Sequence, residues 1–162
     1  MARVLIVGCG CRGRALAEAL VADGHAVRGT SRTEGGRAAI AAAGIEAAAA
    51  DPDRVATVIA QLPGVSVVCW LMASAAGDAE QLADLHGARL ATLLERLVDT
   101  PVRGLVYEAS GSCAPALLRG GTALVEDARQ RWHMPVAVVA ADPSRAQEWV
   151  AAVRAGVAGV LH

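Results

Sequence analysis

Residues 3–20 have the sequence RVLIVGCGCRGRALAEAL, and the interpretation of the whole chain starts from them. A short apolar run, typical of a strand buried on both faces, leads into the pattern G-x-G-x-x-G, and an amphipathic helix begins inside that pattern. Gly8 permits a tight turn, Gly10 lacks the Cβ that would block a diphosphate, and Gly13 lets helix and strand pack closely. The stretch therefore predicts a βαβ unit that binds a dinucleotide at the helix N-terminus. The alternative is a structural core of the same shape without a ligand.

The remainder of the chain alternates between strand and helix patterns. We expect further strands at residues 26–30, 45–50, 65–71, 102–109 and 135–140, and helices at residues 35–43, 53–62, 79–98, 123–132 and from 144 onward. Asp53 is expected to cap one helix, and Ser144 with Gln147 to form a capping box. This order predicts an α/β fold, a Rossmann-type doubly wound parallel sheet of about six strands in the order 3-2-1-4-5-6. Residues 1–162 are expected to form a single domain.

The composition excludes several classes of function. The fifteen basic residues are all arginine, sixteen residues are acidic, and the net charge of −1 leaves no basic excess for nucleic acid or an acidic membrane. No apolar run reaches the about 18 residues that a membrane span needs. Without lysine, Schiff-base chemistry is excluded as well. The four cysteines form no CxxC pair, which favours reduced thiols in a cytoplasmic protein over disulfides or a metal site.

Residues 29–32, after the second expected strand, bear on the choice of coenzyme. An NAD site usually carries Asp or Glu about 20 residues beyond the glycine pattern, where the carboxylate binds the ribose 2′-hydroxyl. This chain has Gly-Thr-Ser-Arg there, so no carboxylate repels a 2′-phosphate, and Arg32 can bind one with help from Arg12. NADP is therefore favoured over NAD, with Ser31 in the same site. The alternative is that Arg32 is a solvated charge in a loop.

Four motifs follow one another in a recognisable order: VGCGCRG at residues 7–13, RGTSR at 28–32, ADPD at 50–53 and LVYEASG at 105–111. In this order they resemble the short-chain dehydrogenase/reductase superfamily, most closely its extended and atypical branches related to sugar-nucleotide epimerases. The resemblance implies that Asp51 contacts the adenine, that the loop from Leu71 to Ala73 flanks the ribose on the nicotinamide side, and that Ser110 polarises a substrate carbonyl. For Asp51, ordinary helix-entry chemistry is the alternative. The expected cofactor-binding residues are Gly8, Gly10, Cys11, Arg12, Gly13, Ser31, Arg32, Asp51, Leu71, Met72 and Ala73.

The chain departs from that superfamily at its catalytic signature. The superfamily uses Tyr-x-x-x-Lys, but this chain has no lysine, and Gly111 stands four residues after its one tyrosine, Tyr107. An extended member also continues into a substrate domain, whereas this chain is expected to stop after a sixth strand and helix. The usual reductase mechanism is therefore unsupported. Glu108 and Ser110, at the end of the fifth expected strand, are the candidates for moving protons; a structural role for both is the alternative.

Two functions remain open from the sequence. One is an NAD(P)-binding oxidoreductase of degenerate short-chain dehydrogenase type, acting on a small-molecule carbonyl compound. The other is a dinucleotide-sensing or interaction module without catalysis. A structural partner subunit is a third hypothesis: in the extended relatives that the chain resembles, the helices before and after strand five pair across a dimer, which implies a homodimer. His86 is expected to be a hydrogen-bonded core or interface residue rather than a catalyst. The face expected to form the dimer contains Leu82, Leu85, His86, Leu90 and Leu93.

Overall fold

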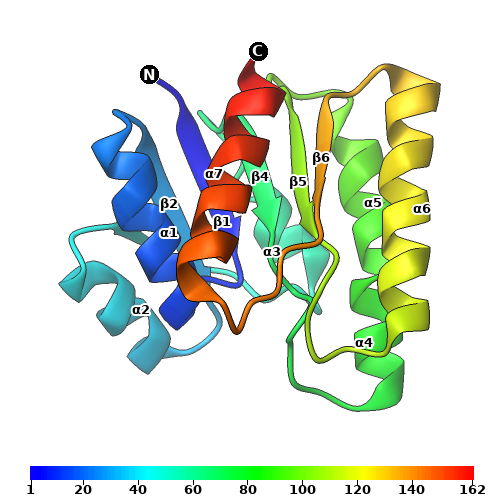
Figure 1. The fold of residues 1–162 in the computed structure, drawn as a ribbon, viewed down its shortest axis with the longest axis horizontal. Helices are drawn as coiled ribbons and strands as arrows, with labels where there is room; N and C mark the ends of the chain where they lie inside the picture. Colours follow the sequence, from blue (N-terminus) through cyan, green and yellow to red (C-terminus); the bar gives the residue numbers. More distant parts are fainter.

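A computed structural model describes residues 1–162, and its six strands form one parallel sheet in the order β3-β2-β1-β4-β5-β6 (Figure 1). The predicted fold class and strand order are confirmed. Each strand pairs in parallel register with its neighbours, so all six carboxyl ends lie at one edge of the sheet. The strands are β1 (Arg3–Val7), β2 (Ala26–Ser31), β3 (Glu46–Ala49), β4 (Val67–Trp70), β5 (Gly104–Glu108) and β6 (Val136–Val139).

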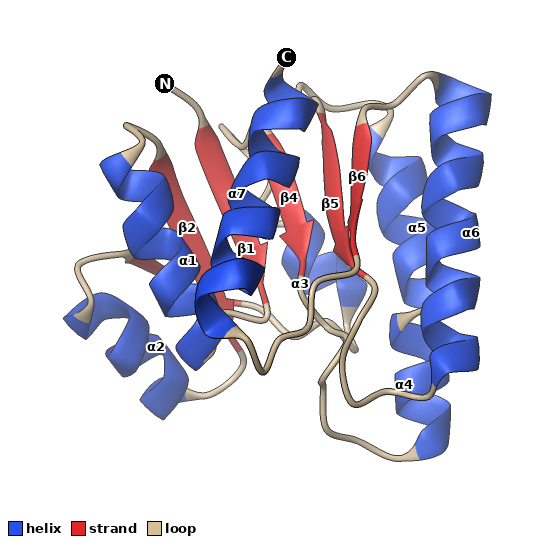
Figure 2. Cartoon of the chain, in the orientation of Figure 1, coloured by secondary structure: helices blue, strands red, loops and turns tan.

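Helices cover both faces of the sheet (Figure 2). One face is covered by α1 (Cys11–Ala22), α2 (Glu34–Ala42) and α7 (Ala146–Leu161). The other is covered by α3 (Val55–Ile59), α4 (Ala79–Leu85), α5 (Ala88–Leu97) and α6 (Pro115–Trp132). This double layer is why the central strands β1 and β4 are almost entirely apolar: both of their faces are buried.

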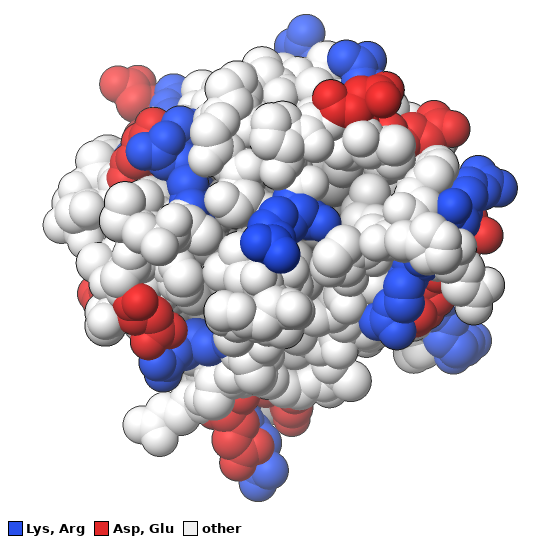
Figure 3. Space-filling view, turned by 90° about the horizontal axis from the view of Figure 1, so that it is seen from above, with Lys and Arg blue, Asp and Glu red and all other residues white.

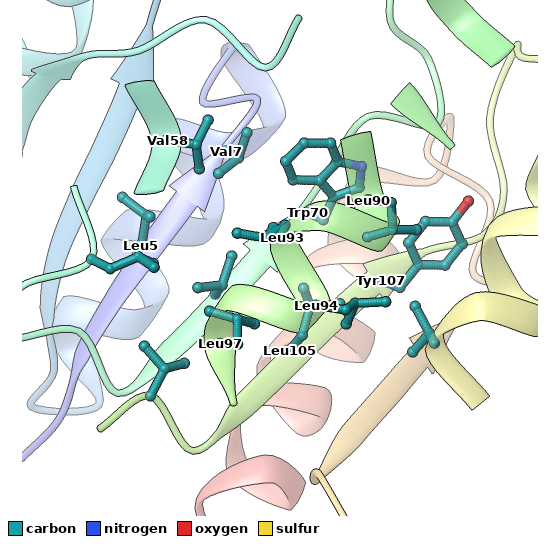
Figure 4. Close-up of a cluster of buried hydrophobic side chains, with 14 of the residues drawn as sticks. Leu5, Val7, Val58, Trp70, Leu90, Leu93, Leu94, Leu97, Leu105 and Tyr107 are labelled. Carbon is teal, nitrogen blue, oxygen red and sulfur yellow. The ribbon is translucent and has the colours of Figure 1, made fainter. Parts of the chain in front are cut away.

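The core is divided by the sheet into two halves. Alternate residues of β1 enter opposite halves, with Leu5 and Val7 on the α5 side and Val4 and Ile6 on the α1 side. Leucines of α5 pack against Trp70 and Tyr107 on the first side (Figure 4). The sequence contains no phenylalanine, so aliphatic side chains and a few large rings fill the interior.

The helix expected at residues 79–98 is broken, and this part of the prediction is wrong. It forms two helices, α4 and α5, separated at His86 and Gly87. The imidazole of His86 bonds the Tyr107 hydroxyl and the Met72 carbonyl inside the protein. A Cβ at position 87 would lie 2.7 Å from the carbonyl oxygen of Ala83, so the bend requires glycine. The hydrogen bonds of a side chain across the core therefore interrupt a stretch whose apolar spacing is helical over its whole length.

The face proposed for a dimer is also wrong. Leu85, His86, Leu90 and Leu93 are all at most 3% exposed because they pack inside this chain, and Leu82 is half-buried. The expectation that His86 is a hydrogen-bonded core residue agrees with its position.

Helix α6 begins eight residues before the expected start at Ala123. The adjacent glycines at positions 120 and 121 argue against a helix in sequence terms, because glycine is a poor helix former. In the structure a Cβ at Gly121 would overlap the hydroxyl and ring of Tyr107. The glycine therefore lets α6 pack closely over β5, and this packing holds the first turns in place.

The two predicted helix caps are not formed. In both Asp-Pro segments, a carboxylate instead accepts a hydrogen bond from the N–H two residues later. Oδ1 of Asp51 accepts from Asp53 at 3.0 Å, and Oδ1 of Asp142 accepts from Ser144 at 2.9 Å. Helices α3 and α7 start after these turns, without a side-chain cap. The turn chemistry of Asp-Pro thus displaces both caps.

Charges of both signs are spread over the surface. On the face seen in Figure 3, most basic side chains lie near the rim beside acidic ones, one lies by itself near the centre, and no large area carries a single sign. None of the helices combines the length and the apolar character required to cross a lipid bilayer.

Candidate functional site

The turn between β1 and α1 has the form that its three glycines predict. Gly8 has φ +91°, and a Cβ there would overlap the carbonyl oxygen of Leu71 at the end of β4. A Cβ at Gly13 would lie 3.1 Å from the carbonyl oxygen of Gly8, so strand and helix meet closely. Gly10 has nothing within 4 Å of its Cβ direction and faces open space. A diphosphate can therefore approach the backbone at Gly10.

The cysteines of this turn do not fill it. Cys9 is 5% exposed and lies beneath the turn, where its sulfur packs against Gly29 of β2. Burial raises the pKa of the Cys9 thiol to about 11, so it is a neutral packing group. Cys11 is exposed at the start of α1. The first backbone N–H groups of α1 have no intrahelical partner.

Two pockets flank the turn, and Gly8 and Gly10 line both. The first, which we call the Arg32 pocket, has a volume of about 260 Å³ and extends over the carboxyl ends of β2 and β3. The second, the Glu108 pocket, has a volume of about 120 Å³ and lies toward β5 and α7. The Arg32 pocket brings together Ser31, Arg32, Asp51 and Met72 from the expected site; the Glu108 pocket brings together Cys11, Arg12, Gly13 and Leu71.

Arginines line both pockets, but not the pair that the sequence suggested. Arg14 joins Arg32 in the Arg32 pocket, whereas Arg12 lines the Glu108 pocket, where its guanidinium lies 5.9 Å from the ring centre of Trp149. The expectation that Arg12 assists Arg32 is therefore wrong. Residues 12 and 14 are about 200° apart around a helix, so their side chains point in nearly opposite directions. The angular position of each arginine on the helix could therefore have identified Arg14.

Arg32 is the most available cation of the first pocket. Its side chain is 57% exposed, and its guanidinium lies 3.9 Å from a carboxylate oxygen of Asp53, a distance at which an exposed pair contributes little. Asp51 has one oxygen engaged by the N–H of Asp53. The pocket thus combines two guanidinium groups and the Ser31 hydroxyl at the end of β2 with the carboxylates of Asp51 and Asp53.

Glu108 is buried at the base of the second pocket and is 1% exposed. Its oxygens accept hydrogen bonds from the N–H of Ala73 at 3.0 Å and from the indole of Trp149 at 2.8 Å. Burial raises the pKa of the Glu108 carboxyl, while these two bonds and the charge of Arg12 oppose the rise. Both oxygens therefore hold neighbouring segments together.

The three expected site residues in the loop after β4 lie in three different environments. Met72 lines the Arg32 pocket and Leu71 the Glu108 pocket. Ala73 lines neither: it is fully buried, and Glu108 accepts its N–H. The structure thus brings ten of the eleven expected cofactor residues to the two pockets and leaves one inside.

Ser110 lies in a third pocket, on the α6 side of β5, which we call the Ser110 pocket. Glu108 does not line it, so the structure gives the two catalytic candidates separate surroundings. The residues of α6 that face Ser110 with a spacing of four are Leu118 and Thr122. Neither is a tyrosine or a lysine. Tyr107 is fully buried, with its hydroxyl 2.6 Å from His86, and does not reach any of the three pockets.

The sheet order and the open glycine turn at its carboxyl edge define an NAD(P)-binding Rossmann fold. Residues 3–63 match the family described as "NADP oxidoreductase coenzyme F420-dependent". This match covers the turn and the Arg32 side of the site. No curated protein matches the chain.

Solved structures share the fold over most of this chain. UDP-glucuronic acid 4-epimerase from Bacillus cereus, in complex with NAD, is 14% identical, with a TM-score of 0.64 over 85% of this chain and 55% of its own. A short-chain dehydrogenase/reductase superfamily protein from Agrobacterium tumefaciens with bound NAD is 20% identical, with a TM-score of 0.68 over 85% and 48%. An anaerobillin reductase from Escherichia coli is 16% identical, with a TM-score of 0.59 over 85% and 71%. The chain thus spans about half the length of the first two proteins.

Proposed function

We propose that this chain binds NADP across the Gly8–Gly13 turn as the dinucleotide domain of an oxidoreductase. The observation that carries the proposal is the open space at Gly10, bounded by two pockets that continue in opposite directions along the sheet edge. The diphosphate would lie on the N–H groups of α1, and the adenosine half in the Arg32 pocket. The nicotinamide half would extend toward Leu71 and β5.

The preference for NADP over NAD rests on the charges at the end of β2. Arg32 and Arg14 line one pocket with Ser31, and β2 ends without a carboxylate. Two guanidinium groups can form charge-assisted hydrogen bonds with a 2′-phosphate. Asp51, in the same pocket, is proposed to contact the adenine. The description of the family matched over residues 3–63 also names NADP.

The chemistry that NADPH would supply when bound is a hydride, and a small carbonyl compound is the proposed acceptor. The usual tyrosine and lysine are missing, and the Ser110 hydroxyl is the group proposed to donate to a carbonyl oxygen in the Ser110 pocket. The proton that completes the alcohol would come from solvent, which reaches this half-exposed position. Residues 1–162 would act as a single domain, in a cytoplasmic setting that keeps its four thiols reduced.

A second candidate function is a dinucleotide-sensing or interaction module without catalysis. The observation that favours it is the pair Leu118 and Thr122 on α6, which supplies no proton relay beside Ser110. A homodimer fits either function, through a surface other than the buried α5 face.

Calorimetric titration with NADPH and with NADH tests the proposal. We expect NADPH to bind and NADH to bind about tenfold more weakly, since one or two charge-assisted bonds are lost. Absence of binding by both at millimolar concentration would end the proposal. Sustained NADPH oxidation with a panel of carbonyl compounds then separates the functions: turnover excludes the sensing module, and binding without turnover excludes the reductase.

A further inference from the structure

The Ser110 pocket has the lining of an anion site. It has a volume of about 400 Å³ and lies between the end of β5 and the first two turns of α6. Its polar side chains are one guanidinium, Arg119, and the hydroxyls of Ser110 and Thr122; none of its lining residues is acidic. A site with a cation and hydroxyl donors but no carboxylate favours negatively charged oxygen over a cation or an apolar group.

Most donors of this pocket are unused inside the chain; the exception is the hydroxyl of Thr122, which donates to the Leu118 carbonyl at 2.8 Å. Arg119 takes part in no ion pair. The backbone N–H groups of Ser110 and Gly111 form no bond with another backbone group. The residues that line the pocket thus carry a guanidinium, the Ser110 hydroxyl and two N–H groups without a backbone partner. Such a set resembles the donors that hold carboxylate and phosphate groups elsewhere in proteins.

The loop that carries Ser110 and Gly111 is held in a fixed position. A Cβ at Gly111 would lie 2.5 Å from Oγ of Ser74 and would overlap the Ala73 carbonyl, so the loop packs directly on the segment after β4. The N–H of Ser112 donates to Oγ of Ser74 at 3.2 Å, and the N–H of Cys113 donates to the Ala73 carbonyl at 2.9 Å. The N–H groups of Ser110 and Gly111 are therefore positioned before any ligand arrives, which reduces the entropy cost of binding.

We propose that the Ser110 pocket binds an anionic oxygen group of the substrate, a carboxylate or a phosphate, with Arg119 as the cation and the N–H groups of Ser110 and Gly111 as donors. The role as a substrate site rests on the proposed oxidoreductase function. The pocket opens at the same sheet edge as the Glu108 pocket, because Ser110 follows Glu108 by two residues at the end of β5. The substrate class is therefore a small carbonyl compound that carries a negative charge.

Inorganic phosphate and acetate are the probes that test this site. Either is titrated into the ¹⁵N-labelled protein without dinucleotide, and the amide resonances of Ser110 and Gly111 are followed by NMR. We expect these two resonances to shift together. The variant Arg119→Gln should weaken the titration by about tenfold, because a charge-assisted contact is lost. Arg96→Gln, on the exposed end of α5, is the matched control and should leave it unchanged.

The outcomes separate the ligand sources and the two proposals. Stronger shifts with phosphate assign a phosphorylated substrate, and stronger shifts with acetate assign a carboxylic acid. Shifts confined to residues 10–12 place the anion at the glycine turn and overturn the Ser110 site, as does an unchanged titration in Arg119→Gln. Because no dinucleotide is present, a failure to bind NADPH removes the proposed function without changing this result.

Discussion

Oε2 of Glu108 accepts a hydrogen bond from the indole Nε1 of Trp149 over 2.8 Å, which joins the end of β5 to the first turn of α7. Oε1 of the same carboxyl accepts the N–H of Ala73 from the loop after β4. One buried carboxyl therefore connects three segments around the Glu108 pocket. Burial raises its pKa, so its contribution to stability depends on pH.

We expect Glu108 to make the folded protein less stable as the pH rises from about 4.3, the ordinary pKa of a glutamate, to the raised pKa in the fold. Over that interval the folded state holds a proton that the unfolded state has released, so a rise in pH favours unfolding. Glu108→Gln removes this titration. It also costs about 1–3 kcal/mol, because the amide nitrogen cannot accept one of the two N–H groups.

Urea denaturation of both proteins at several pH values checks this prediction. The wild-type protein should be the more stable at low pH, and its advantage should shrink as the pH rises through the interval. The contributions of all other titrating groups cancel in this difference. An advantage that is constant or grows with pH contradicts the assignment.

The glycine turn predicts opposite behaviour for two neighbouring substitutions. Gly10→Ala should leave the melting temperature unchanged, since its Cβ meets nothing, but should weaken NADPH binding at least about tenfold by occupying the diphosphate position. Gly8→Ala should destabilise the fold by about 1–3 kcal/mol, because φ is +91° there and the Cβ overlaps Leu71. Thermal unfolding and calorimetry measure the two effects. Unaltered NADPH affinity in Gly10→Ala would show that no diphosphate lies there.

The two arginines of the Arg32 pocket should control selectivity between the coenzymes. We expect Arg32→Ala and Arg14→Ala each to weaken NADPH binding by about tenfold while NADH affinity stays nearly constant, since NADH lacks the 2′-phosphate. Arg12→Ala is the control, because Arg12 lines the other pocket. It should leave the ratio of the two affinities unchanged. If Arg12→Ala alone alters that ratio, the 2′-phosphate lies in the Glu108 pocket.

Adjacent glycines of α6 offer a matched test of the packing around Tyr107. Gly121→Ala should destabilise the protein by about 1–3 kcal/mol, because its Cβ would overlap the tyrosine. Gly120→Ala should stabilise it by up to about 1 kcal/mol, because its Cβ points into open space and alanine is the better helix former. Equilibrium denaturation measures both. Equal effects of one sign would show that α6 does not pack against Tyr107 as described.

Much of the fold follows from local sequence patterns. The order of six strands, the doubly covered sheet and the turn at residues 8–13 depend on apolar runs and glycine spacing, and each of these is visible within about a dozen residues. Right-handed crossovers then leave few ways to arrange the strands. The sequence also placed Ser31, Arg32, Asp51 and Met72 at one sheet edge, because each ends or follows a parallel strand. Their carboxyl ends must meet there.

Other features depend on contacts between residues distant in the chain. The break at His86 and Gly87 exists because a side chain bonds Tyr107 across the core, and the early start of α6 exists because Gly121 fits over the same tyrosine. Arg14 rather than Arg12 lines the Arg32 pocket because of the way α1 is rotated about its axis relative to the sheet. By itself the sequence determined where strands and helices alternate and where a diphosphate can approach. Only the tertiary structure decided which polar groups face the pockets and which are buried and connect separate segments. This division depends on how the helices and strands pack against one another rather than on the spacing of residues along the chain.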